Sequence, residues 1–289
     1  VGISKHAWVL LMFLGVILTW NAYPRTAGPV RWLFRGLRLA GIALLVVLAV
    51  VYRGGNGEQV TWMRTSWWGI LGLIGWAYLI ASASYLAFRG QAAVQVGMVA
   101  LLTAVFIGDK SGALGFLGIL HQYVNVGGHW GGHGSITVAG VVLGMMFLPA
   151  SPVRLGNGRI RWSLVLGIGL LAGGFLLRPL YGISKQEATP AWCLYCAAIC
   201  CFTFAFLYWL VDVKAIRRWS FFLRPAGADP LLAYILPSIV HAGLGVLGVQ
   251  YLNTHFNNGL QGIIRSVVFA LAIVAITDVL YRLRIRLRL

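Results

Sequence analysis

Apolar residues run through this chain in long continuous stretches that short polar segments separate. Nine stretches approach the ~20 residues that a helix needs to cross ~30 Å of hydrocarbon. They cover residues 7–23, 36–52, 67–88, 92–108, 135–150, 161–180, 190–212, 228–249 and 261–281. Because the apolar residues do not alternate with a period of two, strands are not expected. The pattern predicts an all-α transmembrane bundle of about nine spans.

The positive charges divide unevenly between the two ends of these predicted helices. Sixteen cations fall on one side, five fall on the other, and Arg178 and Arg265 lie within predicted spans. The larger set is Arg25, Arg31, Arg35, Arg38, Arg89, Arg154, Arg159, Arg161, Lys214, Arg217, Arg218, Arg224, Arg282, Arg284, Arg286 and Arg288. The smaller set is Lys5, Arg53, Arg64, Lys110 and Lys185. The positive-inside rule predicts that the larger set and the C-terminus are cytoplasmic.

Composition narrows the class of protein further. The chain has 289 residues, of which 60% are apolar and 10% are charged, and its net charge is +17. Soluble domains carry about 25% charged residues, and disordered chains have low hydrophobicity, so both classes are excluded. The basic residues alternate with long apolar runs and do not line one solvated face, which argues against nucleic acid as a partner. The expected partner is the lipid bilayer.

The beginning of the chain conflicts with this orientation. An odd number of spans with a cytoplasmic C-terminus puts Val1 outside, although residue 1 is not Met and no secretory signal precedes the first span. We therefore expect that an even number of further spans precedes residue 1 in the natural reading frame.

The predicted outer segment 109–134 is unusually rich in glycine and histidine. It contains His121 and Asn125, and then His129 and His133 within a glycine run. Ser135 is expected to cap the next helix, whose N-terminus would favour an anion or a developing oxyanion, and the imidazoles could act as general bases. A flexible loop, an active-site loop and a metal site are all compatible. The metal site is the least favoured, because glycines disfavour the helix that would align the two histidines and no third ligand is evident.

Other polar residues near the predicted helix ends have two interpretations each. Lys185 and Glu187, in the outer segment 181–192, belong either to a connector or to the lip of an outward-facing pocket, and Pro190 should lie in the first turn of the next helix. The inner cations Lys214, Arg217 and Arg218 either set the topology and contact lipid headgroups or receive the phosphates of a nucleotide-like cofactor.

Five residues that could carry chemistry lie inside predicted spans. His241 is either a functional intramembrane group or a histidine that hydrogen-bonds a neighbouring helix. The four cysteines fall in the span 190–212 at a spacing that predicts one helical face, and without a second pair they are interpreted as packing residues. They are Cys193, Cys196, Cys200 and Cys201.

A set of short motifs in the second half of the chain has a recognisable order. Ile183-Ser-Lys is followed by Trp192, by Leu-Val-Asp-Val-Lys at 210–214, by Trp219 and Phe221-Phe222, and by Gly-Ala-Asp-Pro-Leu-Leu-Ala-Tyr at 227–234. This order resembles the C-terminal half of the heparan-α-glucosaminide N-acetyltransferase family and its bacterial membrane relatives. Segments 67–78, which begins with Trp67-Trp68, and 134–140 are similar to the bacterial branch.

The resemblance implies a membrane acyltransferase in a bacterial inner (cytoplasmic) membrane. Members of the family move an acetyl group from cytoplasmic acetyl-CoA to an amino sugar on the other side of the membrane, and they have eleven spans. Residues 1–289 would then be a single integral membrane domain that comprises the last nine of them. The catalytic histidine of the family would lie upstream of residue 1, so His133 is only a candidate for the catalytic base here.

The resemblance and the residue pattern together imply two binding regions and no metal. Acetyl-CoA, as co-substrate, would bind near the inner cations Lys214, Arg217 and Arg218. The saccharide acceptor would approach from outside, past the residues His133, His129, Asn125, Lys185 and Trp192. The alternatives are a multi-span carrier for a small sugar or cell-wall fragment, and an inactive truncated relative. Gly140/Gly144 and Gly169/Gly173 could pack helices within the chain or in a homodimer.

Overall fold

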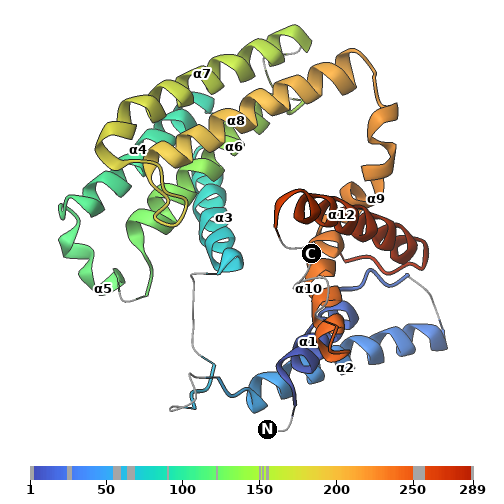
Figure 1. Cartoon of the computed structure of the whole chain (residues 1–289). Coiled ribbons are helices and arrows are strands. Elements are labelled where there is room, and N and C mark those ends of the chain that lie inside the picture. Colours follow the sequence, from blue (N-terminus) through green and yellow to red (C-terminus); the bar gives the residue numbers. More distant parts are fainter. Residues whose placement is uncertain are drawn as a thin grey trace. The chain divides into compact units, whose positions relative to one another are not determined.

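A computed structural model describes residues 3–24, 28–54, 60–63, 69–89, 91–121, 123–149, 151, 153, 156–249 and 258–287 (Figure 1). These residues form helices, turns and two isolated β-bridges, and no strand occurs among them, so the predicted all-α class is confirmed. The chain divides into two compact units. Unit 1 comprises Val1–Arg64 and Arg218–Leu289, and unit 2 comprises Thr65–Arg217.

Each of the nine predicted ranges contains a long helix within the described part of the chain. These helices are α1 (Lys5–Trp20), α2 (Pro29–Val51), α3 (Ile70–Ala87), α4 (Ala92–Lys110), α6 (Gly134–Met145), α7 (Gly156–Tyr181), α8 (Pro190–Tyr208), α10 (Pro230–Val246) and α12 (Gly259–Arg282). Shorter helical segments connect them, namely η1 (Gly115–Leu117), α5 (Gly118–His121), η2 (Val126–His133), η3 (Trp209–Val213), η4 (Arg218–Leu223) and α9 (Arg224–Ala228).

Not every one of these helices is long enough to cross a bilayer. Among the described residues, five helices are long and apolar enough, namely α2, α4, α7, α8 extended by η3, and α12. A sixth is added if α10 and the segment before it, bent by 77°, count as one span. Helix α6 has 12 residues, which at 1.5 Å per residue covers about 18 Å. The structure therefore supports a multi-pass membrane protein with five or six candidate spans.

Two helices begin at least five residues earlier than the apolar pattern predicts. Helix α2 starts at Pro29 and not at residue 36, and α7 starts at Gly156 and not at residue 161. The first turns of α2 therefore carry cations, and Arg38 reaches back to donate a hydrogen bond to the Thr19 carbonyl at 3.1 Å. Long basic side chains can extend a helix beyond its apolar stretch because their stems pack while their charges stay solvated. Arg25, Arg64, Arg154, Arg288, Trp67 and Trp68 lie outside the described residues.

In unit 1, α1 packs against α2 and α10, and α10 packs against α12. Leu232, Ile235 and Leu236 of α10 form a buried core with Ile273 of α12. His241 is exposed, and its Nδ1 lies 2.7 Å from the Pro237 carbonyl of its own helix. The hydrogen bond that it makes is therefore local to α10 and does not join two helices.

Buried polar contacts hold one end of unit 1 together. Asp229, which is 2% exposed, accepts hydrogen bonds from the Leu232 N–H at 3.2 Å and the Leu287 N–H at 3.0 Å. Nearby in sequence, the Arg286 N–H donates to Asn21 Oδ1 at 2.9 Å. One carboxylate thus caps α10 and also fixes the C-terminal segment beside α1.

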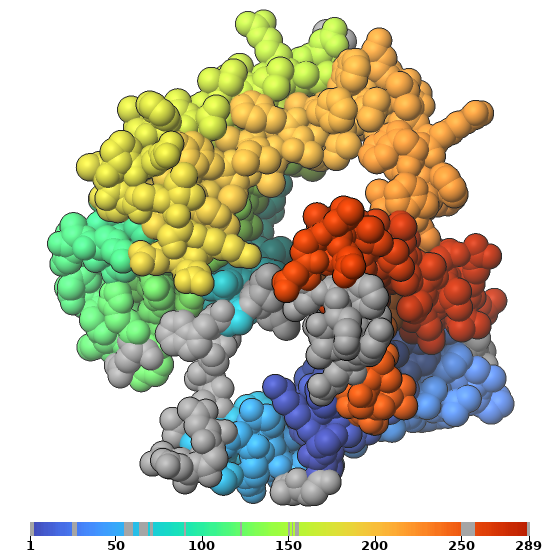
Figure 2. Space-filling view, viewed as in Figure 1, coloured from blue at the N-terminus to red at the C-terminus, as the bar shows by residue number. Residues whose placement is uncertain are grey.

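In unit 2, α7 and α8 pack along their length, and Figure 2 shows their side chains in one continuous surface. Helix α6 packs against α3, α4 and α8. The buried core draws Val99 and Leu102 from α4, Val138 and Val142 from α6, and Ala198 from α8. The units therefore differ in packing. In unit 2, α6 contacts three other helices, whereas in unit 1 only 11% of the residues in the apolar stretch of α2 are buried.

The cysteines of α8 confirm only part of their prediction. Cys193 and Cys201 are buried and pack as expected, and all four thiols are free. Cys200, however, is exposed, so the four side chains do not share one buried face. The reason is that Cys200 and Cys201 are adjacent, and neighbouring residues on a helix point about 100° apart.

Candidate functional site

The segment between α4 and α6 ends in a π-helix, η2, which continues directly into α6. Its sequence is Val-Gly-Gly-His-Trp-Gly-Gly-His, so half of its residues are glycine. π-Helical turns are rare and often occur at functional sites. The glycines were expected to disfavour a helix here, but the segment is helical, because tertiary contacts offset the low helix propensity of glycine.

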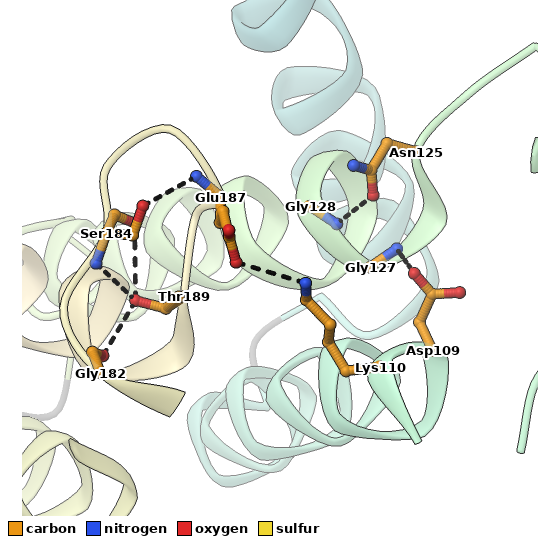
Figure 3. Close-up of polar contacts among 9 residues, drawn as sticks. All are labelled: Asp109, Lys110, Asn125, Gly127, Gly128, Gly182, Ser184, Glu187 and Thr189. Atoms are coloured by element: carbon orange, nitrogen blue, oxygen red, sulfur yellow. Dashed lines mark hydrogen bonds and ion pairs between the residues drawn. The ribbon is translucent and has the colours of Figure 1, made fainter. Parts of the chain in front are cut away.

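Side chains that precede η2 satisfy its first backbone N–H groups (Figure 3). Asn125 Oδ1 accepts a hydrogen bond from the Gly128 N–H at 2.7 Å, and Asp109 Oδ2 accepts one from the Gly127 N–H at 3.0 Å. Asp109 Oδ1 also lies 2.9 Å from His121 Nε2. The end of α4 and the start of η2 are therefore joined through one carboxylate.

Ser135 does not cap a helix. Its hydroxyl donates to the Gly132 carbonyl at 2.7 Å, and the Gly134 N–H already donates within the helix, toward the carbonyls of Gly131 and His129. Because η2 runs into α6, the open helix N-terminus expected at Ser135 is absent there, and the helical segment begins at Val126 after the cap Asn125. The structure therefore rules out the predicted oxyanion site, which required an open helix N-terminus at Ser135.

Two glycines of η2 allow its backbone to approach neighbouring chain segments closely. A Cβ on Gly131 would lie 2.7 Å from the Phe106 nitrogen and 2.9 Å from the Leu102 oxygen of α4. A Cβ on Gly132 would lie 2.5 Å from the Ala188 oxygen in the segment before α8. Backbone atoms cannot move aside as a flexible side chain can, so only glycine fits at these positions. The glycine run thus seats η2 between α4 and the segment before α8.

The two histidines of η2 favour the neutral form. His129 is 4% exposed, and burial lowers its pKa below the ordinary value, with a smaller contribution from the nearby His133. Burial also lowers the pKa of His133, which remains partly exposed. Desolvation disfavours the charged imidazolium, so both rings are mainly neutral at pH 7. A neutral imidazole that solvent can reach is able to accept a proton.

An aromatic ring contacts His133, and two more rings pair between η2 and α3. The His133 ring meets the Trp192 ring of α8 edge to face, with centroids 6.1 Å apart. Trp76 of α3 and Trp130 of η2 lie with their centroids 5.8 Å apart. Aromatic rings give a rigid wall against which the apolar face of a sugar can pack. The structure therefore places the His133 ring against the Trp192 ring, and His133 lies close enough to His129 to lower the pKa of His129.

The segment 182–189 that precedes α8 is fixed by its own hydrogen bonds. Thr189 Oγ1 donates to the Gly182 carbonyl at 3.1 Å and accepts from the Ser184 N–H at 3.0 Å (Figure 3). Glu187 pairs with Lys110 of α4 at 3.3 Å. Pro190 occupies the first turn of α8, as predicted. These contacts join the segment to α4 and hold Trp192 beside η2.

The remaining predicted residues lie apart from this cluster. Lys185 is exposed in the segment 182–189. Lys214 and Arg217 follow η3, at the opposite end of α8 from Trp192, and both are exposed. Lys214 Nζ lies 5.8 Å from the Trp209 ring centroid, and Arg217 Nε donates to the Val211 carbonyl at 3.2 Å. Arg218 begins η4 and belongs to unit 1.

Sequence reasoning did not single out Asp109. It is one of only 6 acidic residues in the chain, and it directly follows an apolar run, which was the available signal. Within the described ranges, no group of three His, Cys, Asp or Glu side chains is arranged to hold a metal ion. The Asp109 carboxylate instead accepts a hydrogen bond from the Gly127 N–H and pairs with the His121 ring.

In comparisons with known proteins, no family model, curated protein or solved structure matches the chain.

Proposed function

We propose that the chain is part of a membrane acyltransferase that transfers an acetyl group from cytoplasmic acetyl-CoA to an amino sugar or related saccharide on the other side of the membrane. The observation that carries the proposal is His133, a neutral and partly exposed imidazole beside Trp192. The motif order at 183–234, which resembles an acetyltransferase family, supplies the reaction class.

The proposal assigns nine crossings to the nine long helices, with the C-terminus in the cytoplasm of a bacterial inner membrane. Helices α1, α3 and α6 are shorter than the spanning helices. Under this assignment they would cross at places where the surrounding helices make the hydrocarbon layer thinner. Pro190–Val213 contains 24 residues, which at 1.5 Å per residue corresponds to about 36 Å and is enough to cross the hydrocarbon layer. Trp192 and Lys214 lie at its two ends, which suits an acceptor on one side and a charged donor on the other.

In the proposed reaction, His133 takes a proton from the acceptor amine as the amine nitrogen attacks the thioester carbonyl. The tetrahedral intermediate then breaks its C–S bond, and the CoA thiolate leaves and receives that proton. Trp192 would orient the sugar ring, and the inner cations Lys214, Arg217 and Arg218 would hold the donor phosphates. His129 would shape the pocket wall, with Lys185 at its rim and Asn125 holding the start of η2.

The direct test uses the full natural reading frame in proteoliposomes that contain radiolabelled acetyl-CoA, with glucosamine added outside. We expect His133→Ala to lower kcat by about 10²- to 10⁴-fold, the usual effect of losing a general base. His241→Ala is the matched control, because it removes an exposed imidazole far along the chain from η2. Acetyl transfer that survives His133→Ala unchanged would remove His133 from the mechanism.

A second readout separates the acyltransferase from the carrier alternative. Acetyl-CoA should raise the melting temperature of the purified protein, because a ligand that binds only the folded state stabilises it. If acetyl-CoA gives no shift and labelled sugar exchanges across the liposome membrane, the protein is a carrier and the acyltransferase proposal fails.

A further inference from the structure

Unit 1 contains a pocket that none of the preceding chemistry uses. It lies between the first turns of α1 and the last residues of α2, and its volume is about 490 Å³. Its polar lining is Lys5 of α1 and Arg53 after α2, and its apolar lining includes Trp8 and Tyr52. The rings of Trp8 and Tyr52 meet edge to face, with centroids 5.5 Å apart. The pocket therefore combines two cations with an aromatic wall.

Arg53 is fixed in place and retains free donors. Its Nη1 donates to the carbonyls of Val50 at 3.0 Å and Tyr52 at 2.8 Å, which belong to the end of α2. A guanidinium has five N–H donors in a planar fork. Within the described part of the chain, Nε and Nη2 have no acceptor, so this edge of the fork can receive a second group. Carboxylates and phosphates are the groups that such a fork pairs with in bidentate fashion.

Lys5 occupies an electrostatically unfavourable position. It is the first residue of α1, whose first turn holds no acidic side chain, and the N-terminus of a helix carries partial positive charge. The carboxylates that the structure describes in unit 1 are engaged elsewhere: Asp229 accepts two backbone N–H groups, and Asp278 pairs with Arg282 at 2.6 Å. Glu58 lies outside the described residues. A bound anion would relieve the repulsion between these positive groups.

Trp8 adds a donor that lacks an acceptor. Its indole Nε1 is enclosed and makes no hydrogen bond with any described residue. A buried polar group without a partner costs free energy, and an indole N–H can only donate. Because this nitrogen is closed to solvent, Trp8 contributes its ring, and not its N–H, to the binding of a ligand in the pocket.

The pocket also lies where phosphate groups are concentrated. Helix α2 is long and apolar enough to span the membrane, and it ends at Val51, directly before Tyr52 and Arg53. Trp62, which is 60% exposed, donates its indole N–H to the Ala49 carbonyl at 2.9 Å. Exposed tryptophans at the end of a span mark the level of the lipid headgroups.

We propose that this pocket binds the phosphate of a lipid headgroup, held by Lys5 and by the free edge of the Arg53 guanidinium. The aromatic wall of Trp8 and Tyr52 packs against the glycerol or sugar that the phosphate carries. The site is independent of the acyltransferase proposal, because its residues belong to unit 1 and take no part in the chemistry assigned to His133.

The test measures binding of short-chain phosphatidylglycerol to the full chain in a neutral detergent by native mass spectrometry. Diacylglycerol of the same chain length, which lacks the phosphate, is the ligand control. We expect one bound phosphatidylglycerol, and we expect Lys5→Gln combined with Arg53→Gln to weaken it about tenfold to a hundredfold. Arg161→Gln, at an exposed cation of unit 2, should leave binding unchanged. The melting temperature of each variant verifies that it is folded.

Two further arms identify the source of the phosphate. If inorganic phosphate displaces the lipid and the double substitution abolishes this competition, the site accepts free phosphates as well as headgroups. If inorganic phosphate does not compete, the site requires the lipid. Arg53→Lys should retain part of the affinity, because it keeps the charge and loses the fork. Equal binding of phosphatidylglycerol and diacylglycerol, or unchanged binding in the folded double variant, would overturn the proposal.

Discussion

The two units use their polar residues in different ways. In unit 2, Asp109, Asn125 and Thr189 form hydrogen bonds with backbone N–H or carbonyl groups around η2 and the segment before α8. In unit 1, α2 and α12 are largely exposed along their length, and Asp229 provides the main polar junction, at one end. Unit 2 therefore concentrates its polar contacts around η2, whereas the described part of unit 1 has buried polar contacts at the end where α10 and the C-terminal segment meet.

Among substitutions that test this difference between the units, the largest loss of stability is expected at Asp229. Asp229→Ala removes the cap of α10 and leaves the Leu287 N–H without its acceptor, which together should lower the free energy of unfolding by about 2–4 kcal/mol. Asp278→Ala, at a partly exposed i,i+4 pair, is the control and should cost less than about 1 kcal/mol. Thermal unfolding in detergent checks both variants, and equal costs would show that unit 1 does not depend on this junction.

The next largest effect concerns Gly131 in unit 2. Gly131→Ala forces a methyl group against the backbone of α4, and overpacking of this kind costs about 1–3 kcal/mol. It should also displace His133 and lower acetyl transfer. Gly140→Ala on α6 is the matched control, because a Cβ there meets nothing within 4 Å. A melting temperature for Gly131→Ala that equals the control value would mean that η2 is not seated on α4 as described.

A third prediction uses the pH dependence of the two histidines in η2. Their pKa values are lowered in the folded state, so the unfolded chain, with a histidine pKa near 6.5, binds protons first as the pH falls. Stability should be constant well above pH 6.5. It should fall as the pH decreases through 6.5 toward the lowered folded-state values, and level off below them.

Melting temperatures between pH 8 and pH 4 would test this dependence. His129→Gln should flatten the curve, because it removes one of the two imidazoles whose pKa burial lowers. The acid limb of acetyl transfer should likewise lie below pH 6.5, since His133 stays neutral to lower pH than a solvated histidine. An acid limb above pH 6.5 would contradict the neutral-base mechanism.

The smallest effect is expected at the Lys110–Glu187 pair. Both side chains are more than half exposed, so the pair is screened by solvent and should contribute at most about 1 kcal/mol. Glu187→Gln should change the melting temperature slightly, and added salt should remove the difference between the variant and the native chain. A larger, salt-independent effect would show that this contact is a necessary part of the junction between α4 and the segment before α8.

Local properties of the sequence were enough to locate the helices. A helix lies in each of the nine predicted ranges within the described residues, because about 20 consecutive apolar residues determine helix position without reference to the rest of the chain. The boundaries at Pro29 and Gly156 were missed, because basic side chains can belong to a helix when their stems pack. The number of crossings does not follow from the pattern alone, because the short helices α1 and α6 depend on their neighbours.

The sequence suggested candidate residues for the site, but it did not reveal the contacts that hold them in place. His129, His133 and Trp192 were expected on one side of the membrane, and the structure places the His133 ring against the Trp192 ring because η2 packs against α4 and α8. Asp109 was missed because its partner Gly127 is 18 residues away in the sequence, and no local pattern indicates that contact.

An all-helical fold with several candidate membrane spans follows from the residues alone, because hydrophobicity and charge act residue by residue. The formation of a π-helix by the glycine run depends on tertiary contacts. Its low intrinsic propensity is overcome by close backbone approaches at Gly131 and Gly132, which require α4 and Ala188 to be in place. The lowered pKa of His133 also depends on tertiary structure, because the burial that causes it comes from residues distant in the chain.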